Sequence, residues 1–178
     1  MKVYLRAFEM EDYKKITRWR KDPEVTKLVV GNKYFISSER DKKWVEEKIF
    51  DDRVNIYSAI CLKENDEMIG YLAIINIDWR NRKAEWGGIT IGDKENQKKG
   101  YAKEAAYLML EYVFEELGLN RFSGYWLESH KPSIQLGLNL GFKKEGIFRE
   151  YAYKRNKFHN IVILSILKKE YEEFNYHL

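Results

Sequence analysis

Residues 97–102, Gln-Lys-Lys-Gly-Tyr-Ala, have the composition of a loop that binds a phosphate group. They follow a β-rich run and precede a helical one, and the first backbone N–H groups of a helix attract anions. Gly100 has no Cβ, so a phosphate can approach its backbone closely and a positive φ is accessible. Ala102 is too small to obstruct the next N–H, while Lys98 and Lys99 add positive charge at the rim. The alternative is a surface loop whose glycine only eases entry into the helix, and spacing alone does not separate the two.

The sequence lacks the residue patterns of several other kinds of site. A Walker loop and a Rossmann glycine fingerprint are both absent, which sets aside a nucleotide bound in either way. The histidines His130, His159 and His177 lack ligand spacing and one cysteine cannot complete a zinc set, so no metal is expected. That cysteine, Cys61, lies in an apolar strand-like run and is interpreted as a small core residue, not a nucleophile.

With its flanking strand and helix, Gln97-x-x-Gly100-x-Ala102 resembles the Gln/Arg-x-x-Gly-x-Gly/Ala motif of the GCN5-related N-acetyltransferases. Further segments agree in order with the subgroup that acetylates ribosomal-protein N-termini, polyamines and amino sugars. These are Leu5-Arg6-Ala7-Phe8 with Asp12, residues 19–25, Ser133-Ile134, Leu140-Gly141-Phe142 and Glu145-Gly146. The resemblance spans nearly the whole chain and favours phosphate binding by the loop.

The resemblance implies that acetyl-coenzyme A (acetyl-CoA) binds where the fourth and fifth strands splay apart. Its pantetheine arm would pair, as an added strand would, with the strand that ends in Ile89-Thr90-Ile91. Its pyrophosphate would lie beside Gln97, on the backbone amides of Lys98, Lys99, Gly100, Tyr101 and Ala102.

Acetyl transfer to an amine needs a neutral amine, a polarised thioester and a proton for the leaving thiolate, but no covalent enzyme intermediate. Glu85, at the start of the predicted fourth strand, is the candidate general base, because it could deprotonate an ammonium directly or through a water. Members of the resembled subgroup often carry a glutamate here. The alternative is an ion pair with Arg80, Arg82 or Lys83.

The proton donor departs from the family pattern. Many members carry a tyrosine four residues after the serine of the fourth helix, and here that position is Gly137. Ser133 could supply a hydroxyl instead, although it is equally suited to the first turn of a helix. His130 stands where asparagine is usual and could hydrogen-bond the pantetheine or the sulfur, with a structural role as the alternative. Solvent is a third proton source, because the CoA thiolate leaves about as readily as a free thiol.

Hydrophobic patterning predicts the elements that hold these residues. Helices are expected over residues 11–21, ended by Pro23, over 38–50, from 101 to Gly118, and over 132–140. Strands are expected over residues 1–8, 56–62, 68–77, 84–91, 121–127, 147–153 and 161–167. This order predicts a mixed α+β sheet with helices on both faces. The resemblance adds the detail of a twisted, mostly antiparallel sheet of about seven strands, splayed between strands four and five.

The composition is that of a folded chain. Its 178 residues are 44% hydrophobic and 34% charged, which suits one core and not two, so residues 1–178 are expected to form a single domain. No apolar run approaches the roughly 18 residues of a membrane span, and residues 1–10 lack the apolar core of a signal peptide. Cys61 cannot form an internal disulfide. A cytoplasmic protein without a membrane partner is therefore expected.

The sequence leaves the acceptor open among protein N-termini, amino sugars and other small primary amines. Residues 31–40 hold Lys33 and Arg40 with one acid, Glu39, which disfavours a polyamine because such a site is expected to concentrate carboxylates. Six aromatic residues could wall an acceptor pocket, with core packing as the alternative for most of them: Tyr34, Phe35, Trp79, Trp86, Tyr151 and Tyr153.

Two other functions stay open. Without the usual tyrosine, the chain could bind acetyl-CoA as a sensor and catalyse nothing. The net charge of +4 also raises nucleic-acid binding, although basic and acidic residues interleave along the chain. The basic patch for that function would be Lys98, Lys99, Lys143, Lys144, Lys154, Arg155 and Lys157. Assembly of two copies into a homodimer is a further expectation.

Overall fold

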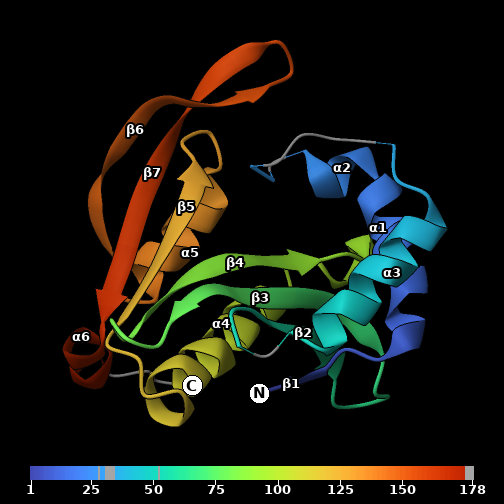
Figure 1. The fold of residues 1–178 in the computed structure, drawn as a ribbon, viewed down its shortest axis with the longest axis horizontal. Coiled ribbons are helices and arrows are strands. Elements are labelled where there is room, and N and C mark those ends of the chain that lie inside the picture. The colour runs from blue at the N-terminus through green and yellow to red at the C-terminus, as the bar shows by residue number, and fades with distance from the viewer. Residues whose placement is uncertain (28, 31–34, 52, 175–178) are drawn as a thin grey trace.

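Seven strands form one sheet in the computed structural model, which describes residues 1–27, 29–30, 35–51 and 53–174 (Figure 1). Their order across the sheet is β1-β2-β3-β4-β5-β7-β6, so that β1 and β6 are its edges. The strands are β1 (Val3–Ala7), β2 (Ile56–Leu62), β3 (Met68–Asp78), β4 (Lys83–Ile91), β5 (Arg121–Leu127), β6 (Lys143–Lys154) and β7 (Lys157–Leu167).

The pairing of β4 with β5 sets the geometry of the molecule. These two strands are parallel, whereas all the other neighbouring pairs are antiparallel. They pair only over residues 83–86 and 121–124 and then separate, and Figure 1 shows β5 rising away from β4. The predicted mixed sheet, with its splay between the fourth and fifth strands, is confirmed.

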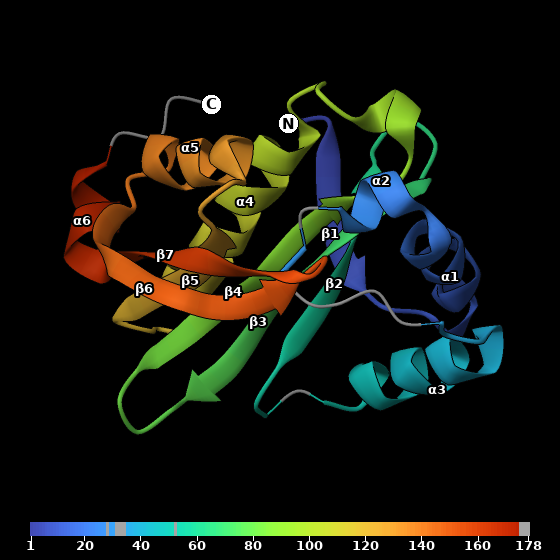
Figure 2. The ribbon, with the colours of Figure 1, turned by 90° about the horizontal axis from the view of Figure 1, so that it is seen from above.

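Helices cover both faces of the sheet (Figure 2). On one face lie α4 (Tyr101–Glu111), continued by a π-helical turn (Tyr112–Glu116), and α5 (Lys131–Asn139), over the larger hydrophobic cluster. On the other face, α1 (Tyr13–Lys21) and α3 (Ser38–Ile49) cover a smaller cluster that includes Trp19 and Val45. Ser37 is the N-cap of α3, because its hydroxyl accepts a hydrogen bond from the Arg40 amide at 3.2 Å.

Three elements differ in detail from the sequence-based expectation. Pro23 ends α1 and also opens a short helix, α2 (Pro23–Thr26), because its fixed φ suits the first helical position. β6 and β7 extend beyond 147–153 and 161–167, since β6 is an edge strand whose mostly exposed residues show no apolar alternation. The pattern also gives no sign of the last helix, α6 (Lys168–Glu173), which is charged and holds no buried residue.

Candidate active site

The candidate phosphate loop turns sharply into α4. Gly100 is the N-cap of that helix with a φ of 87°, in the left-handed region that glycine adopts without strain. A Cβ built on it would meet no atom within 4 Å, so the space beside its backbone is open. The first helical hydrogen bonds run from the Lys103 and Glu104 amides to the Gly100 carbonyl, which leaves the Tyr101 and Ala102 amides without an acceptor inside the helix. Open space beside such amides is what an anionic phosphate needs.

The remaining residues of the loop supply charge and an anchor. Lys98 and Lys99 are exposed, so both ammonium groups are available at the rim. The Gln97 side chain bonds to the backbone, since its Nε2 donates to the Ile91 carbonyl at 3.0 Å. The first residue of the motif therefore ties the loop to the end of β4.

Helix α1 holds the segment that leads into this loop. The Trp19 ring lies so close to the Gly92 backbone that a Cβ there would come within 2.0 Å of it. Trp19 Nε1 donates to Asp93 Oδ1 at 3.0 Å, and Lys94 Nζ lies 3.1 Å from Asp22 Oδ2. Residues 19–25, one of the segments that carried the family resemblance, thus include two residues that position the loop, Trp19 and Asp22.

Strand β4 changes register where it separates from β5. Gly87 has no partner on β3, and Gly88 follows with a φ of 118°, which together form a β-bulge. After the bulge, Ile89 and Ile91 pack partly on the larger cluster, and Thr90 is half-buried. The edge of these three residues that faces β5 is open to the splay, as strand-like pairing with a pantetheine arm requires.

Glu85 lies at the base of the splay and is half-buried. Its Oε2 accepts a hydrogen bond from Asn76 Nδ2 at 2.9 Å. No lysine or arginine nitrogen of the described chain lies within ion-pair distance of this carboxylate, so the alternative of a salt bridge at the strand edge does not apply. Among the described residues, its charge is therefore not neutralised by an ion pair.

Tyr125, which the sequence did not single out, lies near Glu85. Glu85 pairs with Ser123 on β5, and Tyr125 follows two residues later on the same face of the sheet. Burial and then the charge of Glu85 raise the pKa of Tyr125, so this hydroxyl keeps its proton. No local sequence pattern could have found it, because its place beside Glu85 depends on the register of β4 and β5.

His130 and Ser133 lie together at the start of α5. His130 is its N-cap, and its Nε2 is 3.2 Å from Ser133 Oγ. Partial burial lowers the pKa of His130, so the imidazole is neutral at pH 7. The tautomer with a proton on Nε2 donates to Oγ and leaves the Ser133 hydroxyl proton available to another acceptor.

The position of the usual family tyrosine, Gly137, is closed. It is buried, and a Cβ built on it would lie 2.9 Å from Leu164 Cδ1 and 3.9 Å from the Trp126 ring. That ring also covers Gly124, whose Cβ would come within 2.4 Å of it. Trp126 thus takes up space beside this part of α5, and a tyrosine at 137 would displace the packing.

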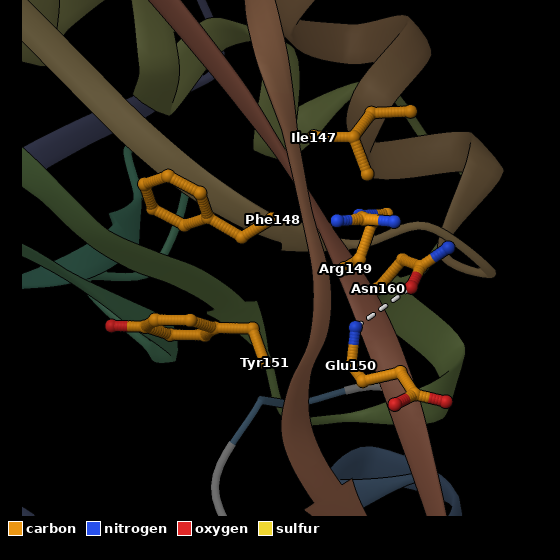
Figure 3. A pocket seen from close by; sticks show the side chains of 6 residues that line it. All are labelled: Ile147, Phe148, Arg149, Glu150, Tyr151 and Asn160. Carbon is orange, nitrogen blue, oxygen red and sulfur yellow. Dashed lines mark hydrogen bonds between the residues drawn. The ribbon is translucent and has the colours of Figure 1, made fainter.

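Three aromatic rings extend from Tyr125 along the sheet. The Tyr125 and Phe148 rings stack with centroids 6.3 Å apart and an interplanar angle of 19°, and Phe148 lies 5.2 Å from Tyr151. We call Tyr125, Phe148 and Tyr151 the aromatic ladder. Figure 3 shows Phe148 and Tyr151 pointing to one side of β6, with Glu150 and Asn160 on the other. β6 bulges between Phe148 and Ala152, where its register on β7 shifts. A hollow of about 850 Å³ at this bulge is lined by Ile147, Phe148, Arg149, Glu150, Tyr151 and Asn160.

The aromatic residues predicted to wall an acceptor pocket lie in different parts of the structure. Trp86 is a core residue that packs on Trp126 and Phe142, which agrees with core packing, the alternative to a pocket wall. Trp79 donates to the Arg53 carbonyl at the far end of β3. Tyr151 belongs to the ladder, whereas the residues that the structure does not describe include Tyr34, Lys33 and His177. Phe35 is fully exposed, and Tyr153 packs on Phe158.

The basic patch does not form one cationic surface. Lys154 is buried and donates to the backbone carbonyls of Thr26 and Val29, at 3.2 and 2.6 Å. Lys143 forms an ion pair with Glu170 at 2.7 Å. Two of the seven predicted members are thus engaged within the chain.

Three further features of the described residues are the cysteine, metal-ligating groups and membrane-spanning helices. Cys61 is buried in the smaller cluster, and burial raises the pKa of its thiol, which fits a core residue. No group of three or more metal-ligating side chains is found in the described part of the chain. None of the helices described is both long and apolar enough to cross a membrane.

Comparison with known proteins gives this geometry its family. The family model of the acetyltransferase (GNAT) domain matches residues 2–143. This chain belongs to the GNAT acetyltransferase family. It is 33% identical over 172 residues to the uncharacterised N-acetyltransferase p20 of Bacillus licheniformis, covering 96% of this chain and 95% of that protein. It is 24% identical over 169 residues to a spermidine N(1)-acetyltransferase of Escherichia coli, covering 95% and 88%.

A solved structure has the same fold. Spermidine N-acetyltransferase from Vibrio cholerae, in complex with CoA and spermine, superposes with a TM-score of 0.87 at 22% identity, covering 96% of this chain and 98% of that one. The splay between β4 and β5 and the candidate phosphate loop are the features expected of a GNAT fold. The chain is an N-acetyltransferase that moves an acetyl group from acetyl-CoA to a primary amine.

Proposed function

We propose that this enzyme binds acetyl-CoA in the splay between β4 and β5 and acetylates a small amine by direct attack in a ternary complex. The observation that carries the proposal is that Glu85, without an ion pair among the described residues, lies where the two strands part. The open amides at the start of α4 lie at the other end of the same strand edge. A thioester lying along β4 would thus have a base at one end and an anion site at the other.

The cofactor contacts follow the path of the strand edge. The pyrophosphate would accept hydrogen bonds from amides of residues 98–102, with Lys98 and Lys99 adding charge. The pantetheine would pair with the backbone of Ile89, Thr90 and Ile91. His130 would hydrogen-bond the arm near the sulfur.

The chemistry needs two proton transfers. Glu85 takes one proton from the substrate ammonium, and the neutral nitrogen attacks the thioester carbon, forming the C–N bond as the C–S bond breaks. The nitrogen then loses a second proton, and the CoA sulfur gains one through the Ser133 hydroxyl or through water. The products are an acetylated amine and CoA thiol, and Glu85 later releases its proton to solvent.

Family membership favours the enzyme over a non-catalytic acetyl-CoA sensor, the alternative that Gly137 in place of tyrosine had left open. A thiol-release assay with acetyl-CoA and a panel of amines separates the two functions. The panel should hold an alanyl peptide, glucosamine, a simple alkylamine and, because of the relatives' names, spermidine. Amine-dependent thiol release supports the enzyme. Tight cofactor binding without release for any amine would support the sensor.

Two broader expectations belong to this proposal. A cytoplasmic location is supported by the single cysteine, which cannot form an internal disulfide. A homodimer is supported by the long exposed edge strand β6, because an unpaired edge is a surface on which a second copy can pair. Light scattering of the purified protein tests the second, and a monomer at all concentrations would exclude it.

A further inference from the structure

The aromatic ladder begins beside the candidate base. Tyr125 is two residues beyond the partner of Glu85 on the same face of the sheet, so its ring is the first apolar surface that an amine at Glu85 would meet. Phe148 and Tyr151 continue the ladder away from the splay. The exposed fractions rise in the same order, 37%, 42% and 64%, so the ladder is accessible along its length.

Of the two described glutamates that act on Tyr125, only Glu85 forms no ion pair. Glu85 and Glu145 are both close enough to the Tyr125 hydroxyl to raise its pKa. Glu145 is already matched, because its oxygens accept from Arg121 at 2.7 and 2.5 Å and from Ser165 at 2.6 Å. Glu150 lies on the other side of β6 (Figure 3). At the Tyr125 end of the ladder, a polyamine would therefore find one free carboxylate among the described residues and apolar rings for its next nitrogen.

Two polar side chains near the candidate base are already hydrogen-bonded within the chain. Asn76 is bonded to Glu85, and Ser165 to Glu145. A carbohydrate needs donors and acceptors for several hydroxyl groups, and unpaired hydroxyls against aromatic rings lose hydrogen bonds to water. These two side chains are thus engaged and unavailable to sugar hydroxyls, whereas the exposed rings of the ladder favour an apolar body.

We propose that the acceptor is an arylalkylamine, an amine with one cationic nitrogen joined by a short linker to a flat aromatic body. This inference rests on the proposed function and specifies its substrate class. The nitrogen lies at Glu85, and the ring lies on the ladder in the offset or edge-on geometry that aromatic pairs adopt. Acetylation follows the steps given above, with the ammonium proton going to Glu85 and the C–S bond of acetyl-CoA breaking.

The experiment compares acceptors under one set of conditions with purified full-length protein. Thiol release is measured with 2-phenylethylamine, ethylamine, spermidine and glucosamine at saturating acetyl-CoA. We expect kcat/KM for 2-phenylethylamine to exceed that of each of the other three by at least about ten-fold, which corresponds to about 1.4 kcal/mol. Equal or better activity with spermidine or glucosamine would overturn the inference.

Two variants locate the effect on the ladder. Tyr151→Ala should raise the KM for 2-phenylethylamine by about ten-fold, with kcat, the KM for acetyl-CoA and the KM for ethylamine each changed by less than about two-fold. Phe158→Ala is the matched control: Phe158 is 61% exposed on the same hairpin, but its ring packs on Tyr153 and not on the ladder. The same KM increase in both variants, or in neither, would refute the role of the ladder.

Failure of the inference can be told apart from failure of the proposed function. If spermidine, glucosamine or ethylamine is acetylated and 2-phenylethylamine is not preferred, the enzyme stands and the acceptor class is wrong. If no amine releases thiol while acetyl-CoA binds, the proposed function fails and this inference with it.

Discussion

A negative charge placed at the start of α4 should block cofactor binding and spare the fold. Gly100→Asp puts a carboxylate where the structure has open space. The φ of 87° costs a residue with a Cβ about 1–2 kcal/mol. As an N-cap, aspartate recovers only a few tenths of a kcal/mol relative to glycine. The variant should therefore lose about 1–2 kcal/mol of stability and still fold.

The effect on binding has a separate cause, the added negative charge. At a separation of about 5 Å and an effective dielectric of about 20, one pair of like charges repels by roughly 3 kcal/mol. Gly100 is exposed, so salt and water reduce this repulsion. We therefore expect affinity for acetyl-CoA to fall by more than about ten-fold, or about 1.4 kcal/mol. Isothermal titration calorimetry measures the affinity, and thermal unfolding monitors the fold.

Gly118→Asp is the matched control. Gly118 also has a positive φ, 60°, but it follows the far end of the same helical segment. Its built Cβ lies 3.5 Å from Arg82 Nη1, so an added carboxylate has a cationic partner. This variant carries the same strain and charge away from the loop and should keep its affinity. Unchanged affinity in a folded Gly100→Asp variant would refute the position of the pyrophosphate.

Three further predictions concern catalysis and stability. Glu85→Gln should lower kcat at neutral pH more than it alters the KM for acetyl-CoA; an unaltered rate and an unmoved acidic limb of the pH profile would argue against a base at this position. Ser133→Ala should cost at least about a hundred-fold in kcat if the hydroxyl donates directly. A loss of only a few-fold points to solvent, and a Tyr→Phe scan that includes Tyr125 then tests for a replacement acid. Arg121 and Ser165 lower the pKa of Glu145 to about 2, so its stabilisation is present above about pH 4.5 and is lost as pH falls toward 2. Glu145→Gln should therefore flatten the acid side of a urea-midpoint profile, and profiles of the same shape would contradict this.

Much of the fold could be predicted because the buried elements have recognisable hydrophobic periods in the sequence. The apolar stripe of α4 and the β-rich runs of β2 to β5 are dictated by burial, and their periods are visible in the sequence. The edge strand β6 could not be delimited, because an exposed strand has no apolar alternation to read. α2 could not be predicted for another reason. Pro23 marks the end of α1 and also begins α2, and the sequence shows only the first of these roles.

The site divides in the same way. Gly100 and the loop were predictable, because the need for a positive φ and for space at a helix start favours glycine. The contact between His130 and Ser133 follows from their spacing across the first turn of α5, once the helix is known to begin there. The aromatic ladder was not predictable, since Tyr125, Phe148 and Tyr151 meet only through strand register and the bulge in β6. Register is a tertiary property, and no local pattern encodes it.

Product analysis tests the central claim most directly. The protein is incubated with acetyl-CoA and one amine at a time, and both the amine and the intact protein are weighed by mass spectrometry. Direct transfer predicts an amine heavier by one acetyl group, formed in step with free CoA, and a protein of unchanged mass during turnover. An acetyl group on the protein during turnover, or CoA binding without any acetylated amine, would contradict the account.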